Sequence, residues 1–181
     1  SSEPASSSST PSSSSVSSGT VSETITGNVK ELSISNSGIQ YENMWVKNTN
    51  QNHDIDIGAE LAKEPAVKMK KDGTIQILIY HTHTTEAFAG SSRTQDNSQN
   101  VVAVGEEIKK QLEAAGFGVV HDTTCHDYPS YNGAYDRSGE TIQRNLEKYP
   151  DIQVTLDVHR DAMGTQDGIR LKPTAMIQGK K

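Results

Sequence analysis

The sequence predicts an α/β fold in which a parallel or mostly parallel sheet is flanked by helices. Three observations predict this fold class. A nearly continuous apolar run over residues 75–80 is typical of a strand that is buried on both faces. Two amphipathic segments follow it, and each is succeeded by another short segment that is predicted to be a strand. The resulting order of strand, helix, strand, helix, strand is the pattern of right-handed crossovers in a parallel sheet.

The first predicted helix follows this strand after a polar stretch. Its apolar residues recur at spacings of three and four positions, which places them on one helical face. These residues are Val101, Val104, Ile108, Leu112 and Ala115. Gly116 stands where a helix commonly ends in a left-handed residue, and residues 117–121 form the second predicted strand.

The second predicted helix is amphipathic in the same way, and Pro150 ends it. Its predicted inner face consists of Tyr135, Ser138, Ile142, Leu146 and Tyr149. Residues 152–158 form the third predicted strand. A fourth strand is predicted to begin at residues 169–171, with residues 175–177 continuing or following it beyond Pro173.

The 181 residues divide into three regions by composition. Residues 1–37 are rich in serine and have little to bury, so we expect a disordered tether. Residues 38–73 form an ordered lead-in, and residues 74–181 carry the α/β pattern. The weaker signals before residue 74 are a short strand over 29–35, a strand or a helix over 41–46, and a short helix over 59–66.

The composition excludes several classes of protein. The formal net charge is −6, which argues against a nucleic acid partner because the phosphate backbone demands a basic face. No apolar run approaches the roughly 18 residues of a transmembrane helix. Cys125 is the one cysteine, so neither an intrachain disulfide nor a multi-cysteine zinc site is possible. The chain begins with serine and has its first methionine at Met44, so we expect that a preceding segment, with any signal peptide or anchor, is absent from it.

Most of the histidines fall near the ends of the three predicted strands. Ligands of parallel sheets bind outside the carboxyl ends of the strands, so polar residues at these ends are candidates for a site. The candidates are His81, His83 and Glu86 after the first strand, His121 and His126 after the second, and Asp157, His159, Arg160 and Asp161 after the third.

Two histidines and one glutamate from this set predict a zinc site. His81 and His83 are two positions apart and share one face of an extended chain, and Glu86 can fold back toward them in a turn. His159 arrives from another strand. Two histidines and a glutamate are a common shell of catalytic zinc, which keeps one position open for water. A lone histidine at a strand end is usually a hydrogen-bonded surface residue, but motifs on two strands together favour a metal.

The remaining polar residues have more than one interpretation. We expect His121 and His126 to stabilise loops, orient ligands or contact substrate rather than bind the metal. Cys125 lies near both histidines in the sequence, and it is either a nucleophile or, as we favour, a free structural cysteine. The segment 128–135 contains three tyrosines and a turn; it either lines a groove for a sugar or peptide or forms a packed loop.

Four segments of the chain resemble the signature of the stage II sporulation protein P family. They are residues 77–88, 121–124, 126–135 and 157–162. The resemblance is close over residues 74–162 and looser back to Gly38. This family is similar to the zinc-dependent N-acetylmuramoyl-L-alanine amidases, which hydrolyse the amide between the lactyl group of muramic acid and the first alanine of the stem peptide.

The resemblance implies a peptidoglycan hydrolase of endospore-forming bacteria that acts in engulfment. It implies zinc as the cofactor and an amidase-like three-layer fold, of which residues 74–181 are the N-terminal portion. It also implies an extracytoplasmic protein, anchored in a membrane through a segment absent from this chain and located between mother cell and forespore. The implied partners are peptidoglycan and the stage II sporulation proteins D and M.

The resemblance also assigns roles to individual residues. His83 and His159 match the positions of two zinc-binding histidines, whereas residues 96–100 lack the glutamate that the amidases have there. We therefore expect Glu86 to be the third metal ligand, and His81 to be either a ligand or a supporting residue. The expected catalytic residues are His81, Arg160 and Asp161, which with Asp157 orient the ligands or stabilise developing charge. The expected substrate-binding residues are His126, Tyr131 and Tyr135.

The amidases use a glutamate on a late strand as general acid and base. This chain ends before a corresponding segment, so we expect a C-terminal truncation, with zinc bound and turnover slow or absent. Two alternatives stay open. One is a metallo-endopeptidase that cuts stem-peptide crosslinks with the same metal, and the other is a non-catalytic module that binds the cell wall through the tyrosine segment.

Overall fold

The computed structural model describes residues 23–181 apart from 27–28, 34–37, 43, 51 and 89–91. The chain divides into two compact units: one is Pro65–Asp161, and the other combines Ser1–Glu64 with Ala162–Lys181. We call Pro65–Asp161 the α/β unit, and all the candidate site residues belong to it. The unit begins ahead of the predicted boundary at residue 74, because Met69 packs against its core. Most of the predicted tether, residues 1–22, lies outside the described residues.

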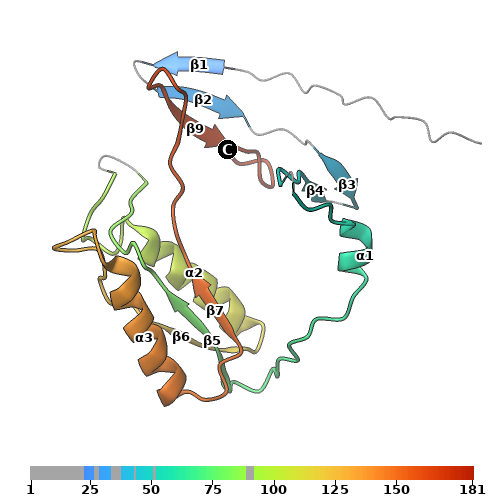
Figure 1. Ribbon diagram of the computed structural model, residues 1–181, viewed down its shortest axis with the longest axis vertical. Coiled ribbons are helices and arrows are strands. Elements are labelled where there is room, and N and C mark those ends of the chain that lie inside the picture. The colour runs from blue at the N-terminus through green and yellow to red at the C-terminus, as the bar shows by residue number, and fades with distance from the viewer. Residues whose placement is uncertain (1–22, 27–28, 34–37, 43, 51, 89–91) are drawn as a thin grey trace, which may run out of the picture. The chain divides into compact units, whose positions relative to one another are not determined.

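The α/β unit is built on a parallel three-stranded sheet with a helix in each crossover (Figure 1). Its strands are β5 (Ile75–Tyr80), β6 (Gly118–His121) and β7 (Val154–Asp157), in the order β6–β5–β7 across the sheet. Helix α2 (Val101–Ala114) connects β5 to β6, and α3 (Ala134–Lys148) connects β6 to β7. The predicted α/β class, with a parallel sheet and flanking helices, is confirmed.

The register of the strands brings their carboxyl ends to one edge of the sheet. Ile79 of β5 pairs with His121, the last residue of β6. Tyr80, the last residue of β5, pairs with Asp157, the last residue of β7. The segments that follow the three strands therefore start side by side, at the edge where parallel sheets bind their ligands.

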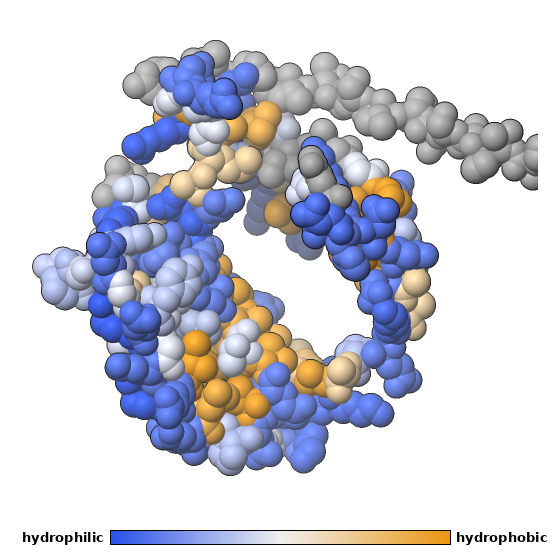
Figure 2. Space-filling model, viewed as in Figure 1, coloured by the Kyte–Doolittle hydropathy of each residue, from blue (hydrophilic) through white to orange (hydrophobic). Residues whose placement is uncertain are grey.

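The middle of the sheet supplies the hydrophobic core. Ile77, Ile79 and Val119 are buried together, and α2 packs against them through Ile108. Leu78 is also fully buried, so β5 is covered on both faces, as its continuous apolar sequence predicts. Burying each of these aliphatic side chains contributes about 1.5–3 kcal/mol to folding. Figure 2 shows hydrophobic residues gathered over this sheet, with hydrophilic residues around them.

Helix α2 turns a slightly different face to the sheet than its apolar spacing predicts. Val104 is 39% exposed and Ala115 is exposed, so these two predicted core positions are wrong. Gly105 is buried instead. A Cβ at Gly105 would lie 2.7 Å from His121 Nε2 and 2.9 Å from His81 Nε2. The missing side chain lets the helix approach the strand ends, and hydropathy does not reveal such a contact.

Helix α3 covers the sheet with a largely polar face. The residues that it buries are Ala134, Ser138, Thr141 and Asn145. The predicted core residues Tyr135 and Leu146 are instead 65% and 41% exposed, so these two positions are wrong. Hydrogen bonds satisfy the polar face, for example between Ser138 Oγ and Thr82 Oγ1 at 2.8 Å. A count of apolar residues misses this face because its contacts are polar.

The other unit contains a four-stranded mixed sheet in the order β1–β2–β9–β8. The strands are β1 (Glu23–Thr26), β2 (Val29–Ser33), β8 (Met163–Gly164) and β9 (Arg170–Thr174). β9 is the strand predicted to begin at residues 169–171, but it pairs in parallel with β2 rather than with the β5–β7 sheet. Its predicted place in the central sheet is therefore corrected. β2 confirms the strand predicted over 29–35, and β1 and β2 both fall within the region expected to be a tether.

A β-hairpin and a short helix complete this unit. β3 (Ile39–Tyr41) pairs antiparallel with β4 (Met44–Val46), so the segment 41–46 belongs to a hairpin and not to a helix. Helix α1 (Ile57–Leu61) starts and ends earlier than the helix predicted over 59–66. Within the described ranges, no helix is both long enough and apolar enough to cross a bilayer.

Candidate metal centre

Three predicted metal ligands come together at the carboxyl edge of the parallel sheet. His83 and Glu86 lie in the segment after β5, and His159 follows β7. Each offers one ligand atom, and the three atoms lie within 4.8 Å of one another. His83 is buried, Glu86 is partly buried and His159 is exposed, so solvent can reach the group. This arrangement suits a metal that keeps one position for water or substrate.

The His159 ring is oriented by Asp157. Its Nε2 lies 2.9 Å from Asp157 Oδ2, and its Nδ1 lies 3.6 Å from Glu86 Oε2. Because an ionised carboxylate only accepts, Nε2 of the neutral ring carries the hydrogen, and the lone pair of Nδ1 is left on the side of Glu86. A carboxylate behind the imidazole is the usual partner of a metal-binding histidine.

Asp157 is itself held in place by Thr82. The Thr82 backbone N donates to Asp157 Oδ1 at 2.9 Å, and the Thr82 hydroxyl donates to Oδ2 at 2.7 Å. Burial raises the pKa of Asp157, but the hydrogen bonds from Thr82 and His159 outweigh burial and leave the pKa below its usual value. Asp157 is therefore ionised at neutral pH and remains an acceptor for the His159 ring.

Glu86 lies between the two histidines. Its Oε2 accepts a hydrogen bond from the backbone N of Arg160 at 2.7 Å, and its Oε1 lies 3.7 Å from His83 Nδ1. Its backbone carbonyl accepts from the N of Val101, the first residue of α2, at 2.9 Å. The loop after β5 is thus tied to α2 on one side and to the segment after β7 on the other.

Two of the predicted substrate-binding residues, Tyr131 and Tyr135, surround His83. The Tyr131 ring stacks on His83 with a centroid distance of 4.4 Å and an interplanar angle of 21°. The Tyr135 ring meets His83 edge-on, at 5.4 Å and 76°. Tyr131 is 50% exposed and Tyr135 is 65% exposed, so both can contact a molecule that approaches the ligands.

His81, predicted as a catalytic residue or a ligand, is fully buried. Its Nδ1 lies 3.0 Å from the Val158 carbonyl oxygen, and its Nε2 lies 2.8 Å from His121 Nε2. The carbonyl only accepts, so Nδ1 carries the hydrogen and Nε2 accepts from His121. Burial is the main cause of a lowered pKa at His81, which keeps the ring neutral. His81 therefore supports the backbone next to His159, and both its nitrogens are already engaged.

The hydrogen bonds continue from His81 to the surface of α2. His121 Nδ1 lies 3.0 Å from Glu106 Oε2, and this contact holds the pKa of Glu106 below its usual value. The His121 side chain is 2% exposed, whereas that of Glu106 is 64% exposed. Gly105 leaves room for both imidazole rings. His81 and His121 thus form a buried hydrogen-bonded pair, and this pair is linked to the surface through the Glu106 carboxylate.

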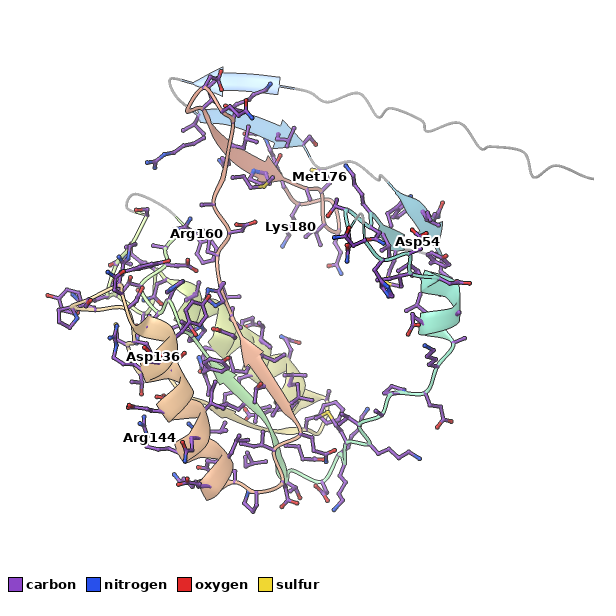
Figure 3. All side chains as sticks on the ribbon, in the orientation of Figure 1. Asp54, Asp136, Arg144, Arg160, Met176 and Lys180 are labelled. Atoms are coloured by element: carbon purple, nitrogen blue, oxygen red, sulfur yellow. The ribbon has the colours of Figure 1, made fainter. Side chains whose placement is uncertain are left out.

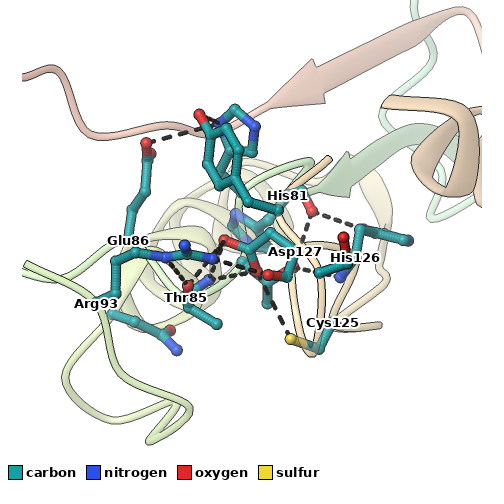
Figure 4. A network of polar contacts seen from close by, with 12 residues as sticks. His81, Thr85, Glu86, Arg93, Cys125, His126 and Asp127 are labelled. Atoms are coloured by element: carbon teal, nitrogen blue, oxygen red, sulfur yellow. Dashed lines mark hydrogen bonds and ion pairs between the residues drawn. The ribbon is translucent and has the colours of Figure 1, made fainter. Parts of the chain in front are cut away.

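A buried carboxylate organises the loops beside the ligands (Figure 4). Asp127, which is 1% exposed, accepts from the backbone N of Thr85 at 3.1 Å and from its hydroxyl at 2.8 Å. Arg93 Nη2 donates to Asp127 Oδ2 at 3.0 Å, and Arg93 Nε donates to Thr85 Oγ1 at 2.8 Å. The Arg93 guanidinium lies 5.0 Å from the centre of the Tyr131 ring. Asp127 therefore holds the guanidinium that lies over the ring stacked on His83.

The surroundings of His126 and Cys125, in the loop after β6, bear on the roles expected for them. His126, expected to bind substrate, is 1% exposed, and its nitrogens lie 2.7 Å from the His81 carbonyl oxygen and 2.8 Å from Thr141 Oγ1. It has no polar atom left for a substrate. Burial, followed by the Asp127 carboxylate, raises the pKa of Cys125. A thiol of raised pKa is a poor nucleophile, which favours the structural interpretation of this cysteine.

Arg160 and Asp161, the remaining predicted catalytic residues, follow His159 directly in the sequence. Figure 3 shows Arg160 in the segment after β7. Besides its backbone contact to Glu86, Arg160 donates from Nη2 to the Ser92 carbonyl oxygen at 2.8 Å. Its Nε is buried and has no hydrogen-bond partner within the described ranges. Asp161 is exposed. The structure thus places Arg160 next to the ligands, and Asp161 one residue further along the chain.

Four residues that the sequence does not single out contribute to this arrangement: Thr85, Arg93, Gly105 and Glu106. Arg93 contacts Asp127 across 34 positions of sequence, and Glu106 contacts His121 across 15 positions. No local sequence motif predicts such contacts, because they depend on how α2 and the loops pack on the strand ends. Thr85 and Gly105 similarly act through the neighbours that the fold gives them.

The donor set fits a zinc ion by its chemistry. Two imidazole nitrogens and one carboxylate, with a second carboxylate behind one imidazole, form the shell that catalytic zinc commonly uses. Of the groups of three or more histidine, cysteine and acidic side chains in the described ranges, this is the one whose ligand atoms converge. The residues could therefore hold zinc and leave a position for water.

The chain is also similar to one family of known proteins. The model of a protein family described as Stage II sporulation protein P matches residues 4–181. Stage II sporulation protein P of Bacillus subtilis (strain 168) is 28% identical over 133 residues, which cover 65% of this chain and 31% of that protein. The chain thus spans less than a third of the length of this curated relative. No solved structure matches the chain.

Proposed function

Because the chain belongs to the stage II sporulation protein P family, we propose that its α/β unit is the metal-binding part of a sporulation peptidoglycan hydrolase. The proposed reaction is hydrolysis of the amide between muramic acid and the first alanine of the stem peptide, with zinc as the cofactor. The observation that carries this proposal is the convergence of His83, Glu86 and His159, whose ligand atoms lie within 4.8 Å of one another.

In this proposal the chain's own residues bind the metal and orient its ligands. A zinc ion held by His83, Glu86 and His159 would polarise the substrate carbonyl and lower the pKa of a bound water. Asp157 keeps a hydrogen on Nε2 of His159, and Nδ1 is therefore available as the ligand atom. The backbone N of Arg160 holds the Glu86 carboxylate between the two imidazoles.

The residues around the ligands receive the substrate. Tyr131 and Tyr135 flank His83 and are exposed, so they form the surface that a bound substrate touches. We assign to Arg160 the stabilisation of negative charge on the amide oxygen, because it carries a guanidinium, directly follows His159 and binds Glu86 through its backbone N. Asp161, the next residue along the chain, is assigned to orienting the groups around the metal ligands.

The location and the partners of the protein are also proposed, on the basis of its family. We propose an extracytoplasmic protein that is anchored in a membrane, acts between mother cell and forespore, and has peptidoglycan and the stage II sporulation proteins D and M as partners. The sheet with its two flanking helices supports an amidase-like three-layer fold for the α/β unit. The matched relative is more than three times as long as the aligned segment, so the activity of a whole protein of this family is carried to this chain only as a proposal.

Zinc content per chain tests the metal centre. We expect close to one zinc per purified chain by elemental analysis, and loss of that zinc in His83→Ala and His159→Ala. His53→Ala is the matched control, because this exposed histidine lies in the other unit and should leave the zinc content unchanged. A folded chain without zinc, or an equal loss in the control, would contradict the proposed centre.

The products that the protein releases from purified cell walls test the reaction. An amidase yields bare glycan strands and whole stem peptides, whereas an endopeptidase creates new amino termini within the crosslinks. A binding module yields no products, and its affinity for the wall would survive His159→Ala. Products of the first kind, lost together with zinc in the histidine variants, are the expected result.

A further inference from the structure

A cavity of about 290 Å³ lies beside the proposed metal centre. Tyr131 forms one wall of it, and the same ring stacks on His83 at a centroid distance of 4.4 Å. Thr85, which follows His83 by two positions, lines the cavity as well. A molecule that reaches the metal ligands along the Tyr131 ring would therefore extend into this cavity.

The charges of the lining cancel. Arg93 and Asp127 are the two charged residues of the lining, and Arg93 Nη2 lies 3.0 Å from Asp127 Oδ2. Asp127 is 1% exposed, and its oxygens also accept from the backbone N and hydroxyl of Thr85. The pair therefore presents no net charge, while the chain as a whole carries −6. An anionic ligand would gain little attraction here.

Aromatic and uncharged polar groups form the rest of the lining. Tyr128 is 55% exposed and Tyr131 is 50% exposed, so two aromatic rings are accessible from the solvent. Pro129 adds an apolar surface between them, and Thr94 and Gln95 add a hydroxyl and an amide. Tyrosine combines a large apolar ring with a polar tip and suits ligands that have both kinds of surface.

We propose that this cavity binds an uncharged N-acetylated amino sugar ring of the glycan strand; this inference rests on the proposed function. Such a ring has apolar C–H faces, which pack on the tyrosine rings, and hydroxyl and amide groups, which reach Thr94 and Gln95. The stem peptide carries carboxylates, which the balanced Arg93–Asp127 pair and the net negative charge of the chain disfavour. The cavity thereby places the glycan on the Tyr131 side of the metal ligands, and the stem peptide on another side.

Titration of the zinc-loaded chain with an N-acetylglucosamine trimer, followed by amide resonances in NMR, tests the inference. We expect shifts at Thr94, Gln95 and Tyr128, and binding at least about five-fold weaker in Tyr128→Ala, since the loss of one aromatic contact is worth about 1 kcal/mol. Tyr149→Ala is the matched control, because this tyrosine lies at the end of α3 outside the cavity lining. This variant should bind the trimer with the same affinity as the unmodified chain.

Two results would overturn the inference. One is the absence of shifts at these residues up to about 10 mM trimer, a concentration that reveals even millimolar binding. The other is a set of shifts at the same residues with a free stem tripeptide and none with the sugar, which would make the cavity a peptide site. Zinc measured in the same samples separates the two proposals. Zinc without sugar binding refutes the glycan site alone, and sugar binding without zinc refutes the metal centre alone.

Discussion

Replacing Asp157 by asparagine tests how His159 is prepared to bind a metal. Asp157 Oδ1 accepts from the Thr82 backbone N, and Oδ2 accepts from both the Thr82 hydroxyl and His159 Nε2. In Asp157→Asn the backbone N still requires an oxygen at the Oδ1 position. The new amide NH₂ therefore takes the place of Oδ2 and faces His159 Nε2. Two donors cannot bond to each other, so the hydrogen of the imidazole moves to Nδ1, the atom that faces Glu86.

The expected consequence is weaker zinc binding with little change in shape. Loss of a partner behind a metal-binding histidine typically costs about 10–100-fold in metal affinity, which corresponds to about 1.4–2.7 kcal/mol. The dissociation constant is measured by competition with a chromophoric zinc chelator at pH 7. Thermal unfolding in the presence of EDTA checks that the metal-free variant still folds.

Asp151→Asn is the matched control, because it removes the same charge from an exposed position shortly before β7. Its zinc affinity should equal that of the unmodified chain. If Asp157→Asn also binds zinc with unchanged affinity, the hydrogen on His159 is not set by Asp157, and the assignment of Nδ1 as the ligand atom is refuted.

Three further predictions concern the packing and the titratable groups of the α/β unit. Gly105→Ala should lower the free energy of unfolding by about 1–3 kcal/mol in urea titrations, because its Cβ would overlap two buried imidazole rings, whereas Gly139→Ala, with no atom within 4 Å of its added Cβ, should not destabilise. Cys125 should react with iodoacetamide more slowly than a free thiol at pH 8, because burial and the Asp127 carboxylate raise its pKa; an equal rate would contradict this. Burial raises the pKa of Asp122, but its hydrogen bonds outweigh burial and leave the pKa below its usual value. The contribution of Asp122 to stability is therefore present above about pH 4 and is lost as the pH falls through the folded-state pKa. The loss of stability between about pH 5 and 3 should therefore be smaller in Asp122→Asn, and an equal loss would speak against the assignment.

The proximity of His83, Glu86 and His159 is the part of the candidate site that the sequence predicts best. His83 and Glu86 follow a strand with a nearly continuous apolar run, and His159 follows a strand of alternating apolar residues. Parallel pairing aligns the ends of these two strands. The register between Tyr80 and Asp157 then brings the two following segments together without any further information. A prediction of this kind depends on topology, and topology follows from the alternation of strands and helices.

The supporting contacts are harder to predict, and the two helices show why. α2 buries Gly105 and α3 buries Ser138, Thr141 and Asn145, yet hydrophobicity counts in favour of Val104 and Leu146 at neighbouring positions. A glycine or a polar residue is buried at these positions only because particular side chains of the sheet and the loops lie opposite it. The same is true of His126, whose buried hydrogen bonds to the His81 carbonyl and to α3 leave nothing for a substrate.

Zinc K-edge X-ray absorption on the zinc-loaded chain tests the central claim most directly. The account predicts two imidazole nitrogens at about 2.0–2.1 Å together with oxygen neighbours at about 2.0–2.2 Å, and the loss of one imidazole signal in His159→Ala. A sulfur neighbour at about 2.3 Å would assign the metal to Cys125 instead. A shell of oxygen alone, without imidazole scattering, would show that His83 and His159 do not bind the ion.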